Sequence, residues 1–244
     1  MERRLDLEGC VNFRDLGGYP TRTGRRLRWR TLFRSDALHA LTSTDVALLR
    51  EQLRMSDIVD LRTSFELDAD GRGLLESEAI AFHHTPLFDG DARAAERAAA
   101  EKLVTLADRY IGMLDFAREP IARVVEILAR ARGGAVYHCA AGKDRTGVIS
   151  AVLMGALEVP DDLIVADYAL SAENIDAIIE RVMGMKGYQD TLADLPPDTL
   201  HAHPETMEAV LRHVGERFGS MSDYLREAGV KPETLDVLRA RCLD

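Results

Sequence analysis

The chain has 244 residues, of which 46% are hydrophobic and 30% are charged, and its formal net charge is −10. These values are typical of one globular domain whose apolar core needs no metal or disulfide for stability. The negative charge argues against general binding to nucleic acid or a membrane surface, which would favour a basic face. We predict a single domain over 1–244, with a helical C-terminal part over about 161–244. An anionic substrate therefore requires a local positive pocket.

The N-terminal residues and the cysteines bear on location. The first six residues have no apolar run behind their charges, and no stretch is long enough to span a membrane. The three cysteines, Cys10, Cys139 and Cys242, form a sparse and odd set that fits free thiols in a reducing compartment. These features predict a cytoplasmic protein, although export without a signal peptide is compatible with them.

The first half of the chain mixes loops with short strands and helices. Residues 12–20 are loop-like and contain a glycine pair, and Arg14 and Asp15 in this loop either cap a turn or take part in function. A helix begins at a capping box with Thr42 as N-cap and Asp45 at N3. Composition and apolar runs predict the remaining elements. These are strands over 30–34, 58–61 and 79–84 and a helix over 91–117.

The second half places one strand between two helices. Residues 119–132 form an amphipathic helix with Pro120 at its first position and Gly133 after its end. A strand follows over 135–138, and after a short loop comes a helix over 146–157 that is apolar nearly all round. The remainder is predicted to be helical except for one connection. The helices span 162–183, 204–218 and two short final segments, and the connection spans 184–197.

The loop before the buried helix reads His138-Cys139-Ala140-Ala141-Gly142-Lys143-Asp144-Arg145-Thr146. Its position places backbone N–H groups at a helix N-terminus, which attracts anions. Cys139 is the predicted nucleophile, because a helix N-terminus and nearby cations stabilise a thiolate. Arg145 has the planar fork that binds two phosphate oxygens at once, and small residues let the backbone wrap round them. The predicted phosphate-binding residues are Ala140, Ala141, Gly142, Lys143, Asp144 and Arg145.

The predicted chemistry is phosphomonoester hydrolysis through a phosphocysteine intermediate, without a metal or other cofactor. Thr146 could hydrogen-bond the Cys139 sulfur and ease its departure, and His138 acts through its ring or by fixing the loop. An acid must also protonate the leaving oxygen. Asp144 is the favoured acid. Asp60, at the end of a predicted strand, is the alternative, although a strand-end Asp more often accepts backbone N–H groups.

The loop is similar to the His-Cys-x5-Arg-Ser/Thr signature of the cysteine-dependent protein tyrosine phosphatase superfamily. Its exact residues, with the motifs at 12–18, 33–38 and 60–63, resemble the bacterial tyrosine/serine protein phosphatase family typified by the mycobacterial tyrosine phosphatase B. The likeness spans roughly 10–160. It implies an α/β fold with a central, mostly parallel sheet flanked by helices, as in protein tyrosine phosphatases, together with metal-independent chemistry and a helical lid within about 165–218.

The resemblance also bears on the substrate. Asp144 resembles the loop aspartate taken as the acid in myotubularin lipid phosphatases, and Lys143 resembles the loop lysine of inositol-lipid phosphatases. The implied partners are therefore phosphorylated proteins or peptides, with tyrosine first and serine or threonine also possible, or a phosphoinositide. Two other functions stay open. The loop could bind phosphate groups without turnover, or it could transfer sulfur as in rhodanese-like proteins.

Overall fold

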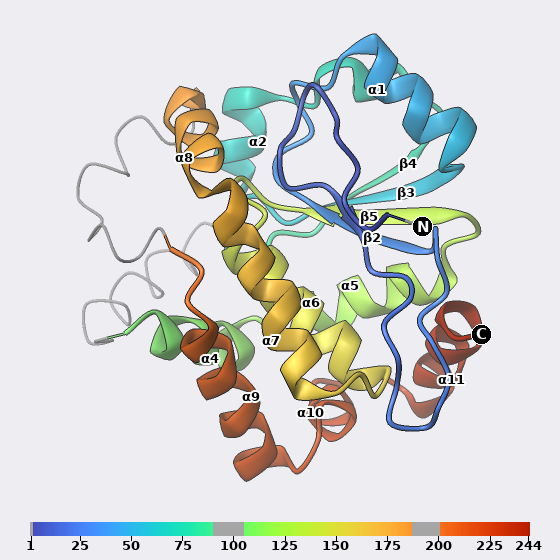
Figure 1. Cartoon of the computed structure of the whole chain (residues 1–244), viewed down its shortest axis with the longest axis vertical. Coiled ribbons are helices and arrows are strands. Elements are labelled where there is room, and N and C mark those ends of the chain that lie inside the picture. Colours follow the sequence, from blue (N-terminus) through green and yellow to red (C-terminus); the bar gives the residue numbers. More distant parts are fainter. Residues whose placement is uncertain (1, 90–104, 187–200) are drawn as a thin grey trace.

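The computed structural model describes residues 2–89, 105–186 and 201–244. Its centre is one five-stranded sheet with the order β1-β2-β5-β3-β4. Only β1 runs antiparallel to its neighbour, and the other three pairs are parallel. The prediction of a mostly parallel sheet flanked by helices is confirmed (Figure 1). The strands are β1 (Arg14–Asp15), β2 (Leu32–Ser35), β3 (Met55–Asp60), β4 (Ala81–His84) and β5 (Gly134–His138).

Helices cover both faces of this sheet (Figure 1). In the described first third of the chain they are short, namely α1 (Ser43–Ala47), η1 (Leu48–Gln52), α2 (Ser64–Asp70) and η2 (Gly73–Ser77). The described later helices are α4 (Leu106–Phe116), α5 (Arg118–Arg130), α6 (Asp144–Ala156), α7 (Asp161–Ala169), η3 (Leu170–Asn174), α8 (Ile175–Gly184), α9 (Pro204–Phe218), α10 (Met221–Glu227) and α11 (Pro232–Cys242).

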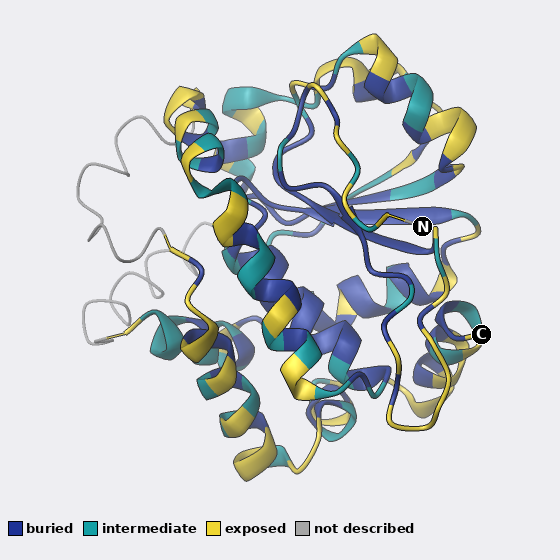
Figure 2. Cartoon of the chain, viewed as in Figure 1, coloured by how far each residue is buried: buried dark blue, intermediate teal, exposed yellow. Residues whose placement is uncertain are grey.

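Two apolar clusters form because successive strand residues point to opposite faces of the sheet. Ile58 and Val136 belong to the cluster on the side of α1, whereas Val59 and Tyr137 belong to the larger cluster around α5 and α6. The larger cluster runs from Leu16 to Leu243, so it joins both ends of the chain. Figure 2 shows the central strands β2 and β5 together with α6 as continuously buried elements.

The structure corrects several predicted boundaries. The capping box of Thr42 and Asp45 is present as predicted. Pro120 is the third residue of α5 instead of the first, a position where its missing N–H still costs nothing. The predicted helix over 162–183 is interrupted by η3, which divides it into α7 and α8. The predicted helical residues before 105, and most of the 184–197 connection, lie outside the described residues.

The loop at 139–143 lies at the carboxyl edge of the sheet. Ser35, Asp60 and His138 are register partners at the ends of their strands, so three strands finish beside the loop. Ligands of parallel α/β sheets bind at this edge. In the part of the chain that the structure describes, no helix combines the length and the apolar character needed to cross a bilayer.

Candidate active site

Cys139 is the first residue after β5 and is buried, with 1% of its surface exposed. The Thr146 hydroxyl, on the first turn of α6, donates a hydrogen bond to the Cys139 sulfur at 3.2 Å. This contact is the one that the sequence predicted for Thr146. It places a neutral donor where negative charge on sulfur would develop.

The backbone carbonyls of residues 140–142 are all held by hydrogen bonds from outside the loop. The backbone N–H of Ala37 donates to the first at 3.0 Å, the Asn12 amide to the second at 3.2 Å, and the Arg34 guanidinium to the third at 2.8 Å. Across a trans peptide the next N–H points the opposite way. The N–H groups of residues 141–143 are therefore turned toward the inside of the loop.

These inward N–H groups can accept an anion as a hydrogen-bond partner. The N–H groups of Ala141 and Gly142, and also that of Ala140, donate to no acceptor within the described residues. Lys143 is the N-cap of the 13-residue helix α6, and its side chain does not cap the helix. Consecutive N–H groups at a helix N-terminus make an anion-binding concavity. The backbone arrangement is compatible with the predicted phosphate-binding loop, which stays a prediction.

Arg145 is buried and its planar guanidinium is fixed from one side. Its two terminal nitrogens donate to the two carboxylate oxygens of Glu66 at 2.6 and 2.7 Å, and one also donates to the Leu61 carbonyl at 3.2 Å. The Glu66 carboxylate in turn accepts from the backbone N–H of Thr63 at 2.6 Å, within the capping box that begins α2. The fork is therefore pre-oriented by a carboxylate that is itself anchored.

Glu66 was not among the residues predicted from the sequence, although a signal for it was present. Thr63-Ser64-Phe65-Glu66 is a capping-box pattern, which places the glutamate against the start of a helix. The pattern predicts the local contact to Thr63. It does not predict the bidentate pair with Arg145, because those residues are far apart in the chain.

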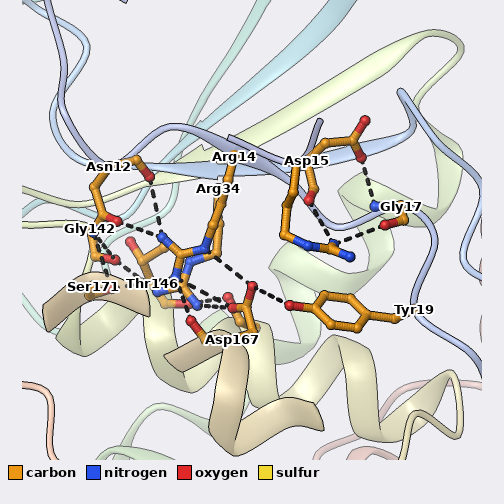
Figure 3. A network of polar contacts seen from close by, with 12 residues as sticks. Asn12, Arg14, Asp15, Gly17, Tyr19, Arg34, Gly142, Thr146, Asp167 and Ser171 are labelled. Atoms are coloured by element: carbon orange, nitrogen blue, oxygen red, sulfur yellow. Dashed lines mark hydrogen bonds and ion pairs between the residues drawn. The ribbon is translucent and has the colours of Figure 1, made fainter. Parts of the chain in front are cut away.

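A buried network of ion pairs lies behind the loop (Figure 3). Asp167 of α7 accepts from Arg14 at 3.2 Å and from Arg34 at 2.6 Å, and the Tyr19 hydroxyl donates to it at 3.2 Å. Burial by itself raises the pKa of Asp167, but the two guanidiniums outweigh it and lower this pKa to about 2. The carboxylate is therefore ionised, and it ties β1 and β2 to α7.

Asn12 connects this network to the loop. Its side-chain oxygen accepts from Arg14 at 2.5 Å, which turns the amide nitrogen toward the carbonyls of Ala141 and Gly142, each at 3.2 Å. The motif at 12–18 thus supports the loop from behind. Asp15 fits the predicted role of turn cap, because it accepts from the backbone N–H groups of Gly17 and Arg30, both at 2.7 Å. Arg14 does not cap a turn.

The two acid candidates differ in access. Asp144 has 32% of its side chain exposed, whereas Asp60 has none. Both Asp60 oxygens are engaged by Arg62, through its guanidinium at 2.6 and 3.0 Å and through its backbone N–H at 3.0 Å. Asp60 therefore has the structural environment that the sequence favoured for it, and only Asp144 presents an accessible carboxylate.

Asp144 lies among cations and a phenol. One of its oxygens accepts from the Tyr110 hydroxyl at 2.6 Å and pairs with the Lys143 ammonium at 2.9 Å. Burial raises the pKa of Asp144, but Lys143, the Tyr110 hydrogen bond and Arg145 together hold it below its ordinary value. The Lys143 ammonium also donates to the backbone carbonyl of His201 at 3.3 Å, so this ammonium is held between Asp144 and the residue His201.

His138 is almost fully buried, and its ring nitrogen lies 3.7 Å from the Asp60 carboxylate. Burial lowers the pKa of His138 to about 4 despite this carboxylate, so the ring is neutral near pH 7. Of the two roles that the sequence left open, fixing the loop suits a buried neutral ring.

Other candidate groups stand apart from this site. Cys10 and Cys242 are free and buried. His83 bonds to Asp57 and His84 to the backbone carbonyl of Arg62, so the two rings have separate partners. Among the residues described, no group of His, Cys, Asp or Glu side chains has the arrangement of a metal site.

The sequence is similar to known proteins of one enzyme family. The model of the tyrosine phosphatase family matches residues 5–244. The chain is 30% identical over 274 residues to the triple specificity protein phosphatase PtpB of Mycobacterium tuberculosis, a match that covers 96% of this chain and 97% of that protein.

Two further relatives agree with this family. A Cupriavidus necator protein, provisionally named a tyrosine-protein phosphatase, is 28% identical over 231 residues, covering 92% of this chain and 83% of its own. A tyrosine-protein phosphatase of Nostoc commune is 27% identical over 190 residues, which cover 75% of this chain and 64% of that protein. The predicted family is thereby confirmed: the chain is a phosphatase and belongs to the tyrosine phosphatase family.

Proposed function

We propose that this phosphatase hydrolyses phosphomonoesters through a phosphocysteine intermediate formed on Cys139. The observation that carries the proposal is the cradle itself. The N–H groups of residues 140–142 directly follow Cys139 in the chain and have no acceptor within the described residues, and the guanidinium of Arg145, on the first turn of α6, is held by Glu66. Phosphoryl transfer needs chiefly this kind of positioning and charge stabilisation.

In the first step, the Cys139 thiolate attacks phosphorus while the bond from phosphorus to the ester oxygen breaks. The inward N–H groups and Arg145 hold the three non-bridging oxygens. The departing oxygen takes a proton from Asp144, so the alcohol or phenol leaves neutral. The negative charge of the bound phosphoryl group raises the affinity of Asp144 for that proton and opposes the effect of Lys143.

In the second step, a water oxygen attacks phosphorus and the bond from sulfur to phosphorus breaks. Asp144 takes the proton from the water, which restores its acid form and releases inorganic phosphate. The Thr146 hydroxyl, 3.2 Å from the sulfur, stabilises the thiolate as it leaves. Neither step requires a cofactor.

The proposed substrates are phosphorylated proteins or peptides, with phosphotyrosine first and phosphoserine or phosphothreonine also accepted. The name of the mycobacterial relative states triple specificity for that protein, which supports a broad range here. A phosphoinositide is the second candidate, because Lys143 adds a cation to the loop beside Arg145.

We further propose that 1–244 acts as a single phosphatase domain and that its lid includes α8. Support for the single domain comes from the large apolar cluster, which joins both ends of the chain. Support for the lid comes from Ile178 and Val182 of α8, which pack with Ala37 and with Ala140 of the loop.

Replacement of the nucleophile tests the proposed chemistry. Cys139→Ser should abolish turnover of p-nitrophenyl phosphate, measured with a chelator present, and should retain phosphate binding measured by calorimetry. Cys242→Ser changes another buried thiol and serves as the matched control. Turnover at the wild-type rate in Cys139→Ser would contradict the proposal. Phosphate binding by the wild type with no hydrolysis of any substrate in a panel would favour a binding module, and activity toward thiosulfate alone would favour sulfur transfer.

Replacement of the acid tests its assignment. Asp144→Asn should slow a phosphoserine peptide, whose leaving group is poor, by about 100-fold or more, because general acid catalysis contributes roughly that much. p-Nitrophenyl phosphate, whose leaving group needs little protonation, should be slowed far less. An equal effect on both substrates would exclude Asp144 as the acid.

A further inference from the structure

Two buried tyrosines from different helices meet beside the acid. Tyr110 of α4 is fully buried and Tyr168 of α7 is 1% exposed. Their hydroxyls lie 2.9 Å apart, and their rings meet edge to face with centroids 6.0 Å apart. The Tyr110 hydroxyl is also 2.6 Å from one oxygen of Asp144. A chain of three polar groups therefore runs from α7 through α4 to the N-terminus of α6.

The direction of these hydrogen bonds follows from the chemistry of the groups. An ionised carboxylate only accepts, so Tyr110 donates to Asp144. A phenol has one proton, so Tyr168 must be the donor to Tyr110. Burial raises the pKa of both phenols, which keeps them protonated and able to donate. A hydrogen bond that is polarised by another is strengthened.

The packing against α6 leaves room for this series of hydrogen-bonded groups. Gly147 lies one turn after the loop, and a Cβ atom there would be 3.1 Å from the ring of Tyr168. The absence of that atom lets the ring lie against α6 and brings its hydroxyl to Tyr110. Neither hydroxyl is accounted for by the phosphate cradle or by the Arg14, Arg34 and Asp167 network.

The consequence for Asp144 is a fixed orientation. Its Oδ1 atom accepts a hydrogen bond from the Tyr110 hydroxyl and pairs with the Lys143 ammonium. Its Oδ2 atom forms no hydrogen bond with any residue in the described ranges. A carboxyl group held through one oxygen presents the other one, and this side chain is partly exposed. Oδ2 is therefore the atom placed to carry the proton that the leaving oxygen takes.

We propose that Tyr110, oriented by Tyr168, is a positioning residue that fixes the general acid of this phosphatase with its Oδ2 atom toward the substrate. The proposal rests on the proposed role of Asp144 as acid. It adds that the acid depends on two helices outside the loop, because both phenols come from elements packed against α6.

The charged and titratable groups around Asp144 determine how loss of the Tyr110 hydroxyl changes the pKa of Asp144. Lys143 and Arg145 face it from the loop and from α6, Tyr110 faces it from α4, and Tyr168 lies behind Tyr110 on α7. Burial raises the pKa of Asp144, and Lys143, Tyr110 and Arg145 lower it. Loss of the Tyr110 donor leaves the cations in place and raises this pKa.

The test is the pH profile of kcat for a phosphoserine peptide. Tyr110→Phe should lower the maximum and move the descending limb to higher pH by about one unit, the effect of one hydrogen bond to a charged group. Tyr168→Phe should move the limb in the same direction by less. Tyr224→Phe is the matched control, because it removes another buried hydroxyl, one that donates to Leu114 of α4 at 2.7 Å. A structural effect on α4 would lower the rate at every pH without moving the limb.

The possible outcomes distinguish a failure of the positioning role of Tyr110 from a failure of the acid role of Asp144. If Asp144→Asn keeps the descending limb, the acid assignment itself fails. If Asp144→Asn removes the limb but Tyr110→Phe leaves it in place, or if Tyr224→Phe moves it equally, only the positioning role is overturned. Should Tyr110→Phe fold poorly, Tyr168→Phe and a carbon-13 NMR titration of the Asp144 carboxyl carry the same test.

Discussion

Gly142 occupies a backbone position that no other residue suits. Its φ of +65° lies in the left-handed region, and a Cβ atom there would be 2.5 Å from the backbone nitrogen of Asp36. Its carbonyl is also the one that Arg34 holds. The loop therefore requires glycine here for both conformation and space, whereas Ala140 and Ala141 retain side chains.

Gly142→Ala should disrupt the cradle more than the fold. The strained φ and the backbone contact together should cost on the order of 3 kcal/mol, so vanadate affinity should fall at least tenfold when measured by inhibition. Gly215→Ala, where a Cβ meets nothing within 4 Å on α9, is the control and should leave affinity unchanged. Wild-type affinity in Gly142→Ala would show that the loop accommodates a side chain.

At the scale of elements, α7 is joined to the sheet through charge as well as apolar packing. Asp167 is almost fully buried and is bonded to Arg14 and Arg34, which come from β1 and β2. Arg34 also bonds to the loop. One carboxylate thus holds α7, two strands and the phosphate loop in a fixed relation.

Asp167→Asn should be strongly destabilising, because it leaves two buried guanidiniums without a countercharge. Loss of one partner from a buried ion pair costs about 3 to 5 kcal/mol, which urea denaturation at pH 7 would detect. Asp161→Asn on the same helix removes the exposed pair with Arg22 and should change stability by less than about 1 kcal/mol. Equal effects of the two substitutions would contradict the role given to Asp167.

For the whole molecule, two buried titratable groups whose pKa values are lowered by folding make stability depend on pH. The unfolded chain protonates His138 near its ordinary pKa of 6.5, whereas the folded chain does so only near 4. The pKa of Asp167 is lowered from 3.8 to about 2 by its two arginines, against burial. In both cases the unfolded state binds the proton first as pH falls, so acid favours unfolding.

Stability should therefore decline in two stages as pH falls. Between about pH 6.5 and 4, His138 should remove about 3 kcal/mol, and between about pH 4 and 2, Asp167 should remove about 2 kcal/mol. Urea denaturation at a series of pH values measures both stages. His138→Gln should flatten the first stage and leave the second, and an unchanged slope above pH 4 would contradict the neutral buried state of His138.

The sequence by itself determined the strand–loop–helix order, the family and the capping box at Thr42, because each is encoded by neighbouring residues. It placed β2, β3, β4 and β5 within a few residues, yet it gave β1 as part of a loop and missed the break between α7 and α8 at η3. Only the tertiary structure decided which distant groups meet, namely Glu66 with Arg145, Asp167 with two arginines, and Tyr110 with Asp144. Hydrogen bonds between remote residues leave no periodicity in the chain, and burial, which distinguishes Asp60 from Asp144, arises only when elements pack.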